Sequence, residues 1–241
     1  MTRQPIISLT NITREYRLGN VPVRALENVT LEIAHGDFLA LAGPSGSGKT
    51  TLLNLIGCID KPDSGRILFD GVDVTGIPLH RLSRLRLQSL GFVFQTFNLI
   101  PVLTAFENVE YPLLMQGVPK RRRESKVRHW LDQVGINQQS GQRPDEMSGG
   151  QRQRVGIARA MVGDPRLVVA DEPTANLDSE NASRILDLLA RLNETTRATF
   201  VLSTHDPAVM ARARRVIRLR DGRVAGEESN PMVIDTEEVA C

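Results

Sequence analysis

The segment GPSGSGKT, from Gly43 to Thr50, could bind a phosphate chain. It fits the pattern G-x-x-x-x-G-K-[ST], in which successive backbone N–H groups and a helix N-terminus point at phosphate oxygens. There Lys49 reaches the β- and γ-phosphates, and the Thr50 hydroxyl binds Mg²⁺. The alternative, a surface turn rich in Gly and Ser, rarely needs Lys and Thr at these positions. We therefore expect nucleotide contacts from Gly43, Pro44, Ser45, Gly46, Ser47, Gly48, Lys49, Thr50 and Thr51.

Two adjacent carboxylates end a second apolar run, LVVADE, from Leu167 to Glu172. The run predicts a buried strand, and open α/β folds bind ligands at the carboxyl ends of their strands. Asp171 could then hold Mg²⁺ directly or through water, and Glu172 could accept a proton from water that attacks the γ-phosphate. Paired acids at a strand end are otherwise often a solvated turn. The phosphate segment upstream favours the catalytic interpretation.

A third group, Ser148-Gly149-Gly150-Gln151, precedes the helical pattern RQRVGIARAM. Ser148 is a natural N-cap, and the two glycines leave backbone N–H groups accessible, so this is a second candidate anion site. Taken alone, the group could equally be only a helix cap. Because the two helix starts fall in different predicted lobes, a dimer that sandwiches nucleotide between copies would use both.

The predicted elements place these groups in an α/β fold. The run FLALA ends at the phosphate segment and is apolar throughout, as in a strand buried on both faces of a parallel sheet. Short β-favouring runs between residues 5 and 33 predict antiparallel strands, and residues 61–65 predict a turn. The other expected elements are helices over 51–56 and 179–193, strands over 91–94, 167–170 and 199–203, a mainly helical lobe over 81–162, and final strands over 216–219 and 223–225.

Composition excludes several classes of protein. Thirty Lys and Arg residues against 28 Asp and Glu leave a net charge of +2, too balanced to indicate a nucleic-acid binder. No apolar run reaches the roughly 18 residues of a membrane span, and no signal peptide is evident. Cys58 and Cys241 offer neither metal-ligand spacing nor a disulfide framework, which favours a reducing cytosol.

With these motifs together, the sequence resembles ABC ATPases from Ile6 to about Glu227. The S-G-G-Q signature separates that family from other phosphate-loop NTPases; Met147 stands where the family often has Leu, a swap of similar volume. The resemblance implies a RecA-like phosphate-loop NTPase core with an N-terminal antiparallel β subdomain and an inserted α-helical subdomain. We expect one ABC ATPase domain over 1–228, with the helical subdomain at about 96–163, and a tail over 229–241.

The resemblance also implies roles for single residues. Tyr16 would stack on adenine, although it could be an ordinary strand tyrosine. Gln95 would contact magnesium and water and sense a membrane partner, or be merely a polar residue at a strand end. Asp178 would communicate between the two sites of a dimer, and His205 would contact the γ-phosphate, although a lone histidine is usually structural. The cofactors implied are ATP and Mg²⁺.

Partners are implied by the family too: a homodimer, an integral membrane permease, in some members a periplasmic or extracytoplasmic adaptor, and no nucleic acid. The stretches 52–65, 97–114 and 171–179 look most like the lipoprotein-releasing and macrolide-exporter branch, although Ala175 stands where that branch has Gly. That predicts an ATPase at the cytoplasmic face of the inner membrane, peripheral through a separate permease, which energises export or extraction of a lipoprotein, drug or peptide. The alternatives are a force-transmitting ATPase that regulates cell-wall hydrolases, and a soluble ABC protein acting on DNA or ribosomes.

Two surface features remain open on sequence alone. Lys120–Arg123, Lys126 and Arg128 form the densest positive patch, which is either a solvated helix start or a contact with acidic lipid or the permease. Four phenylalanines also cluster around Gln95, and one or two of them could line a groove that accepts a permease helix: Phe92, Phe94, Phe97 and Phe106.

Overall fold

The computed structural model describes residues 4–19 and 21–230 and contains a central, mainly parallel sheet. Five strands run parallel in the order β9-β3-β8-β7-β6, and β10 pairs antiparallel with β9 at the edge. This α/β architecture confirms the predicted fold class. The strands are β3 (Phe38–Ala42), β6 (Leu90–Val93), β7 (Leu167–Asp171), β8 (Thr199–Thr204), β9 (Arg215–Arg220) and β10 (Arg223–Ser229).

β3 is buried on both faces, as its apolar sequence predicts. Phe38, Ala40 and Ala42 pack into one hydrophobic cluster, while Leu39 and Leu41 pack into another on the opposite face of the sheet. Successive strand residues point to opposite faces, so one short strand joins both cores. The loop that leaves this strand is therefore anchored on a rigid element.

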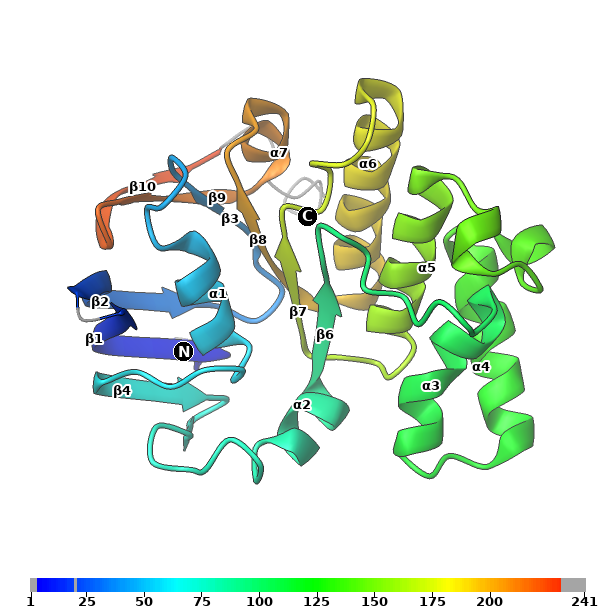
Figure 1. Cartoon of the computed structure of the whole chain (residues 1–241), viewed down its shortest axis with the longest axis horizontal. Coiled ribbons are helices and arrows are strands. Elements are labelled where there is room, and N and C mark those ends of the chain that lie inside the picture. Colours follow the sequence, from blue (N-terminus) through cyan, green and yellow to red (C-terminus); the bar gives the residue numbers. More distant parts are fainter. Residues whose placement is uncertain (1–3, 20, 231–241) are drawn as a thin grey trace, which may run out of the picture.

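A second, antiparallel sheet lies on one side of the parallel sheet (Figure 1). Its strand order is β2-β1-β4-β5, and β1 (Ile7–Leu18) and β2 (Val21–Ile33) form a long irregular pair. β4 (Ser64–Phe69) and β5 (Val72–Asp73) were not predicted, and the turn expected over 61–65 is wrong from Ser64 onward. Ser64 pairs with Thr13 of β1, so the strand depends on a partner distant in sequence.

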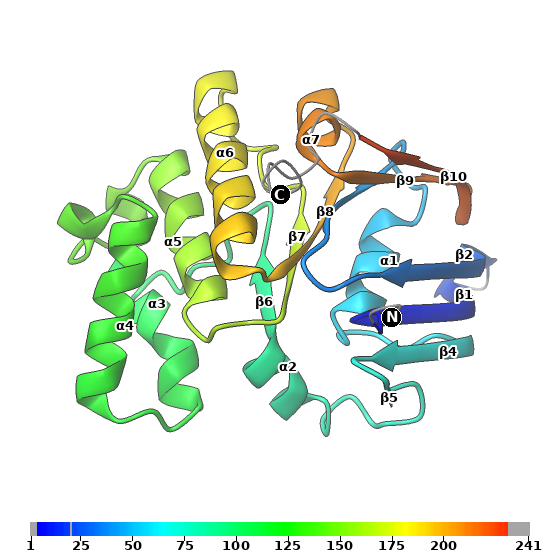
Figure 2. The same cartoon turned by 180° about the vertical axis from the view of Figure 1, so that it is seen from behind.

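Helices cover both faces of the parallel sheet. One hydrophobic cluster packs α1 (Lys49–Ile56) against both sheets. The other packs α5 (Gly149–Met161) and α6 (Ser179–Thr196) against the opposite face of the parallel sheet. Both views place α3 (Ala105–Met115), α4 (Lys120–Gln133) and α5 together, on the side away from the antiparallel sheet (Figures 1 and 2). The remaining helical segments are α2 (Ser83–Ser89), α7 (Pro207–Arg212), and the 3₁₀ turns Asn137–Gln139 and Pro144–Glu146.

Several predicted boundaries shift in the structure. α1 begins at Lys49 rather than at residue 51, and the short α7 was not predicted. β10 continues to Ser229, and Asn230 donates its backbone N–H to Arg214, so order extends past the predicted start of the tail. The rest of the tail lies outside the described residues. Within the described ranges, no helix is both long and apolar enough to cross a membrane.

Candidate nucleotide site

The phosphate segment lies between β3 and α1, as predicted. Gly48 has a φ of 100° and fits tightly, because a Cβ there would lie 2.5 Å from the carbonyl oxygen of Ala25. Lys49 is buried, and its Nζ donates to the carbonyls of Gly43 and Pro44 at 2.8 and 2.9 Å. The hydroxyl of Ser47 is buried and has no hydrogen-bond partner among the described residues. The loop thus concentrates an ammonium group, a hydroxyl and a helix N-terminus.

Thr50 and Asp171 face each other across the site. The Thr50 hydroxyl lies 3.3 Å from Asp171 Oδ1, and the Ser203 hydroxyl donates to that same oxygen at 2.5 Å. Among the described residues, no cluster of three or more His, Cys, Asp or Glu side chains could hold a metal. A hydroxyl and one carboxylate nevertheless fit Mg²⁺, which usually keeps several waters and takes further ligands from substrate phosphates.

Glu172 follows β7 in an uncommon backbone conformation. Its φ is 44°, in the left-handed region, and Ser203 anchors its N–H through the backbone carbonyl at 3.2 Å and the hydroxyl at 3.1 Å. Its Oε1 lies 2.8 Å from Nδ1 of His205, the residue that follows β8. The Glu172 side chain is 17% exposed and that of His205 is 68% exposed. The structure therefore brings together the acid and the histidine that the sequence separates.

Lys49, Thr50, Asp171 and Glu172 line one cavity of about 350 Å³. Gln95, just after β6, also lines this cavity, and its carbonyl accepts a hydrogen bond of 2.9 Å from the Asn176 side chain. β2 contributes part of the wall beside the phosphate loop. The lining residues are Val23, Arg24, Ala25, Ser45, Gly46, Gly48, Lys49, Thr50, Thr51, Gln95, Asp171 and Glu172.

Tyr16 lies beside this wall rather than in the lining, since it pairs with Val23 in the sheet. Its hydroxyl donates to Asp60 at 2.8 Å, and the Arg14 guanidinium covers its ring at 4.6 Å from the centroid. Arg14 also donates to both carboxylate oxygens of Asp60 at 3.0 Å. The ring is therefore held at its hydroxyl end and on one face.

The Ser148 group is not in the lining of the cavity of its own chain. Ser148 accepts from the Gln151 N–H at 3.3 Å and donates its own N–H to the Gln151 side chain at 2.8 Å, which completes a capping box. A Cβ on Gly150 would lie 3.1 Å from the amide oxygen of Asn181, in the first turn of α6. The helix start predicted to bind anions therefore packs against α6.

Asp178 caps that same helix α6. Its carboxylate accepts from the Asn181 N–H at 2.9 Å and from the Asn181 side chain at 2.7 Å. These hydrogen bonds, led by the one from the backbone, lower the pKa of Asp178. Asn181 thus contacts both Asp178 and the helix start that Ser148 caps, although β7 separates the two helices in the sequence.

Comparisons with known proteins agree on one family. A family model described as "ABC transporter" matches residues 26–175. The uncharacterized ABC transporter ATP-binding protein MJ0796 of Methanocaldococcus jannaschii is 43% identical, over 92% of this chain and 97% of that protein. This chain belongs to the ABC transporter family. The resemblance seen in the sequence is confirmed, and the chain is an ATP-binding ATPase cassette of that family.

Other relatives define how far the similarity extends. A macrolide export ATP-binding/permease protein, MacB 1/2 of Paracoccus denitrificans, is 44% identical over 94% of this cassette but only 34% of its own length. The cassette thus spans about a third of the macrolide-export relatives that it matches. A dimeric structure of MJ0796 in a post-hydrolysis state with ADP and Pi is 41% identical, has a TM-score of 0.87, and is covered over 98% of its chain.

Three side chains around the cassette's site were not foreseen from the sequence. Ser203 holds Asp171, Asp60 holds Tyr16, and the buried Gln153 of α5 donates to the carbonyl of Pro173, next to Glu172, at 2.6 Å. Asp60 lies in the family-like stretch 52–65 and Gln153 in the helical run after Gln151, but neither was assigned a role from the sequence. All three contacts form across the fold. The roles predicted for Tyr16, Gln95, Asp178, His205 and Ser148 stay predictions.

Proposed function

We propose that this cassette hydrolyses ATP as a dimer and thereby drives export or extraction through a separate membrane permease. The observation that carries the proposal is the cavity itself. It collects Lys49, Thr50, Asp171 and Glu172 in one chain, while the Ser148 group lies outside it. A second copy would supply that missing anion site.

Each side chain has a distinct task in this proposal. Two of the three Lys49 N–H groups are used by loop carbonyls, which leaves one for a phosphate oxygen. Thr50 and Asp171, with Gln95 beside them, would hold Mg²⁺, which would neutralise charge on the β- and γ-phosphates. Ser203 fixes the Asp171 carboxylate in place.

Glu172 is proposed as the base. With Asp171 facing Thr50, Glu172 is the next carboxylate in the cavity and can accept a proton from attacking water. His205 restrains Glu172 through their 2.8 Å contact and would itself bind the γ-phosphate. Tyr16 would stack on adenine, with its free face turned to the base.

The dimer would bury two nucleotides between copies. Ser148–Gln151 of the second copy would close over the phosphates, and Asp178, linked to that helix start through Asn181, would report closure to the other site. MJ0796, a relative of known structure, is dimeric in a structure with ADP and Pi. Hydrolysis would release the clamp, and the helices α3–α5 would move apart.

The membrane role follows from the relatives rather than from this chain alone. The macrolide-export relatives carry ATP-binding and permease parts under one name, which favours export over a force-relaying role. We propose that this cassette, a single domain over residues 1–228 with a helical subdomain at about 96–163, binds a permease at the cytoplasmic face of the inner membrane. An extracytoplasmic adaptor would complete the assembly.

Glu172→Gln tests this function directly. The variant is expected to lose ATP turnover by a factor of at least about 10² while it still binds ATP and Mg²⁺, because only the proton acceptor is removed. Phosphate release and binding of a fluorescent ATP analogue would be measured on the same preparation. Turnover at the wild-type rate would exclude Glu172 as the base.

A further inference from the structure

The basic patch of the sequence lies on the helical pair α3 and α4. The turn between these helices is at the edge of the molecule, away from the antiparallel sheet (Figures 1 and 2). Because the two helices pack side by side and run in opposite directions, the end of α3 and the start of α4 meet at this edge. No described residue of α3 or α4 lines the nucleotide cavity. The proposed chemistry therefore leaves the patch without a task.

Half of the six cations in the patch are neutralised within the fold. Arg123, for example, lies 2.8 Å from Glu110 of α3, and both side chains are mostly buried. The three ion pairs are Lys120–Glu124, Arg123–Glu110 and Lys126–Asp164. Because each of these positive charges faces a negative one, the three cations attract an external anion only weakly.

The other three cations have no carboxylate partner in the part of the chain that the structure describes. They are Arg121, Arg122 and Arg128, and all three residues are exposed. They lie on the side of α4 opposite to Val127 and Trp130, which are buried. One side of the helix thus carries three uncompensated positive charges.

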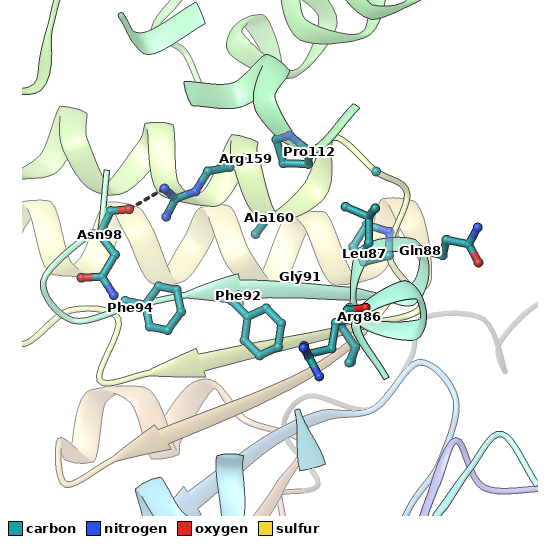
Figure 3. A pocket seen from close by; sticks show the side chains of 14 residues that line it. Arg86, Leu87, Gln88, Gly91, Phe92, Phe94, Asn98, Pro112, Arg159 and Ala160 are labelled. Carbon is teal, nitrogen blue, oxygen red and sulfur yellow. Dashed lines mark hydrogen bonds between the residues drawn. The ribbon is translucent and has the colours of Figure 1, made fainter. Parts of the chain in front are cut away.

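Arginines elsewhere in this region use their donors within the chain. Arg159 of α5 donates to the carbonyls of Phe97 and Asn98 at 2.9 and 2.6 Å, and Figure 3 shows it turned toward Asn98. Arg121 and Arg122, by contrast, have no side-chain hydrogen bond to any described residue. A guanidinium carries five N–H donors, so both side chains can offer all of them to an external anion.

Exposed apolar side chains accompany these arginines. Leu114 and Met115, the last two residues of α3, are 50% and 56% exposed, and Tyr111, one turn earlier, is 44% exposed. Their spacing places the three on one face of α3. Only residues 116–119 separate this apolar end from Lys120, where α4 begins. The edge therefore presents apolar surface next to uncompensated arginines.

We propose that this α3–α4 edge, residues 111–122, contacts the membrane surface and binds anionic phospholipid head groups through Arg121 and Arg122. The inference rests on the proposed function, in which a permease holds the cassette beside the membrane. Charge complementarity selects the lipid, since the cytoplasmic leaflet has a negative surface potential that attracts clustered Lys and Arg. Leu114 and Met115 would enter the boundary between head groups and acyl chains.

This contact is expected to be weak by itself. One cation near an anionic surface typically strengthens binding about five-fold, so Arg121 and Arg122 together would supply about 25-fold. Arg128, about 10 Å further along α4, would add attraction at longer range. Stable attachment to a membrane needs a second signal, which the permease would provide. The α3–α4 edge would then fix the orientation of the cassette against the bilayer.

The first experiment measures binding of the cassette alone to vesicles by co-sedimentation at low ionic strength. Vesicles of phosphatidylcholine are compared with vesicles of equal parts phosphatidylcholine and phosphatidylglycerol. We expect binding to the anionic vesicles only, and Arg121→Gln combined with Arg122→Gln should weaken it about 25-fold. Absence of binding to the anionic vesicles, equal binding to both kinds, or wild-type binding by the double variant would overturn the proposal.

A matched control separates the edge from the net charge of the cassette. Arg66→Gln combined with Arg220→Gln removes the same charge from β4 and β9, at side chains that are 62% and 80% exposed. This control should bind anionic vesicles nearly as well as the wild type. If it loses as much binding as the Arg121 and Arg122 variant, the attraction is general and the edge is not a lipid site.

The second experiment uses the complex of the cassette with the permease that co-purifies with it, in a bilayer of the anionic mixture. p-Benzoylphenylalanine at Met115 should crosslink to phospholipid on irradiation, as mass spectrometry would show. Crosslinks to the permease alone would mean that protein covers the edge, and would refute the proposal. ATPase activity is measured for every variant. If the wild-type cassette hydrolyses ATP and drives the permease but binds no anionic lipid, only the lipid proposal fails.

Discussion

The hydroxyl of Ser203 lies 2.5 Å from Oδ1 of Asp171 and donates a hydrogen bond to it. The same hydroxyl accepts the backbone N–H of Glu172 at 3.1 Å. One small side chain at the end of β8 thus orients the proposed magnesium ligand and fixes the backbone of the proposed base. Ser203 is fully buried, so water does not reach its hydroxyl in the folded protein.

Removing this hydroxyl should weaken the response to magnesium. We expect Ser203→Ala to raise the Mg²⁺ concentration needed for half-maximal ATPase activity by about 10-fold, because ligand-orienting groups typically contribute that much to metal affinity. Activity is measured across a magnesium titration at saturating ATP. Ser203→Thr, which keeps the hydroxyl, should recover most of the affinity. A wild-type titration curve for Ser203→Ala would contradict the role.

Tyr16 should depend on Asp60 for its placement. Asp60→Ala removes the acceptor of the tyrosine hydroxyl and the bidentate partner of Arg14, so the ring loses two restraints. We expect KM for ATP to rise by about 10-fold with kcat nearly unchanged, since uniform binding is lost. Asp63→Ala is the matched control, because Asp63 contacts Arg14 but not the tyrosine hydroxyl. Equal effects of the two variants would argue against this placement.

The phosphate loop contains a matched pair of glycines. At Gly48 a Cβ would meet the Ala25 carbonyl at 2.5 Å, whereas at Gly46 no atom lies within 4 Å, and both residues have positive φ. Gly46→Ala should cost about 1 kcal/mol of unfolding free energy from backbone strain alone. Gly48→Ala should cost roughly 2 to 4 kcal/mol, because overpacking adds to that strain. Urea denaturation measures both, and equal losses would show that the loop relaxes freely.

Local motifs explain why residues that lie together in the candidate site could be singled out from the sequence. A short run of sequence predicts a strand followed by a loop or by an acid pair. These junctions contain Lys49, Thr50, Asp171 and Glu172. Their partners could not be found this way. Ser203 is 32 residues from Asp171 and Asp60 is 44 residues from Tyr16, so only the folded sheet reveals these contacts.

The same reasoning explains the errors in the fold. β3 was predicted because both of its faces are apolar, a property that its own sequence carries. β4 was missed because Ser64 and Gly65 look like turn residues, and their pairing with β1 depends on distant partners. α7 has only six residues, too few for a helical period to stand out.

The composite pocket is tested most directly by the molar mass of the cassette in solution with ATP and Mg²⁺. Glu172→Gln should change from monomer to dimer when ATP is added, and Glu172→Gln combined with Ser148→Arg should bind ATP yet stay monomeric. Light scattering after size-exclusion chromatography gives both masses. If Glu172→Gln remains monomeric with ATP, Mg²⁺ and the permease present, or if the Ser148 substitution leaves the dimer intact, the pocket is not shared between copies.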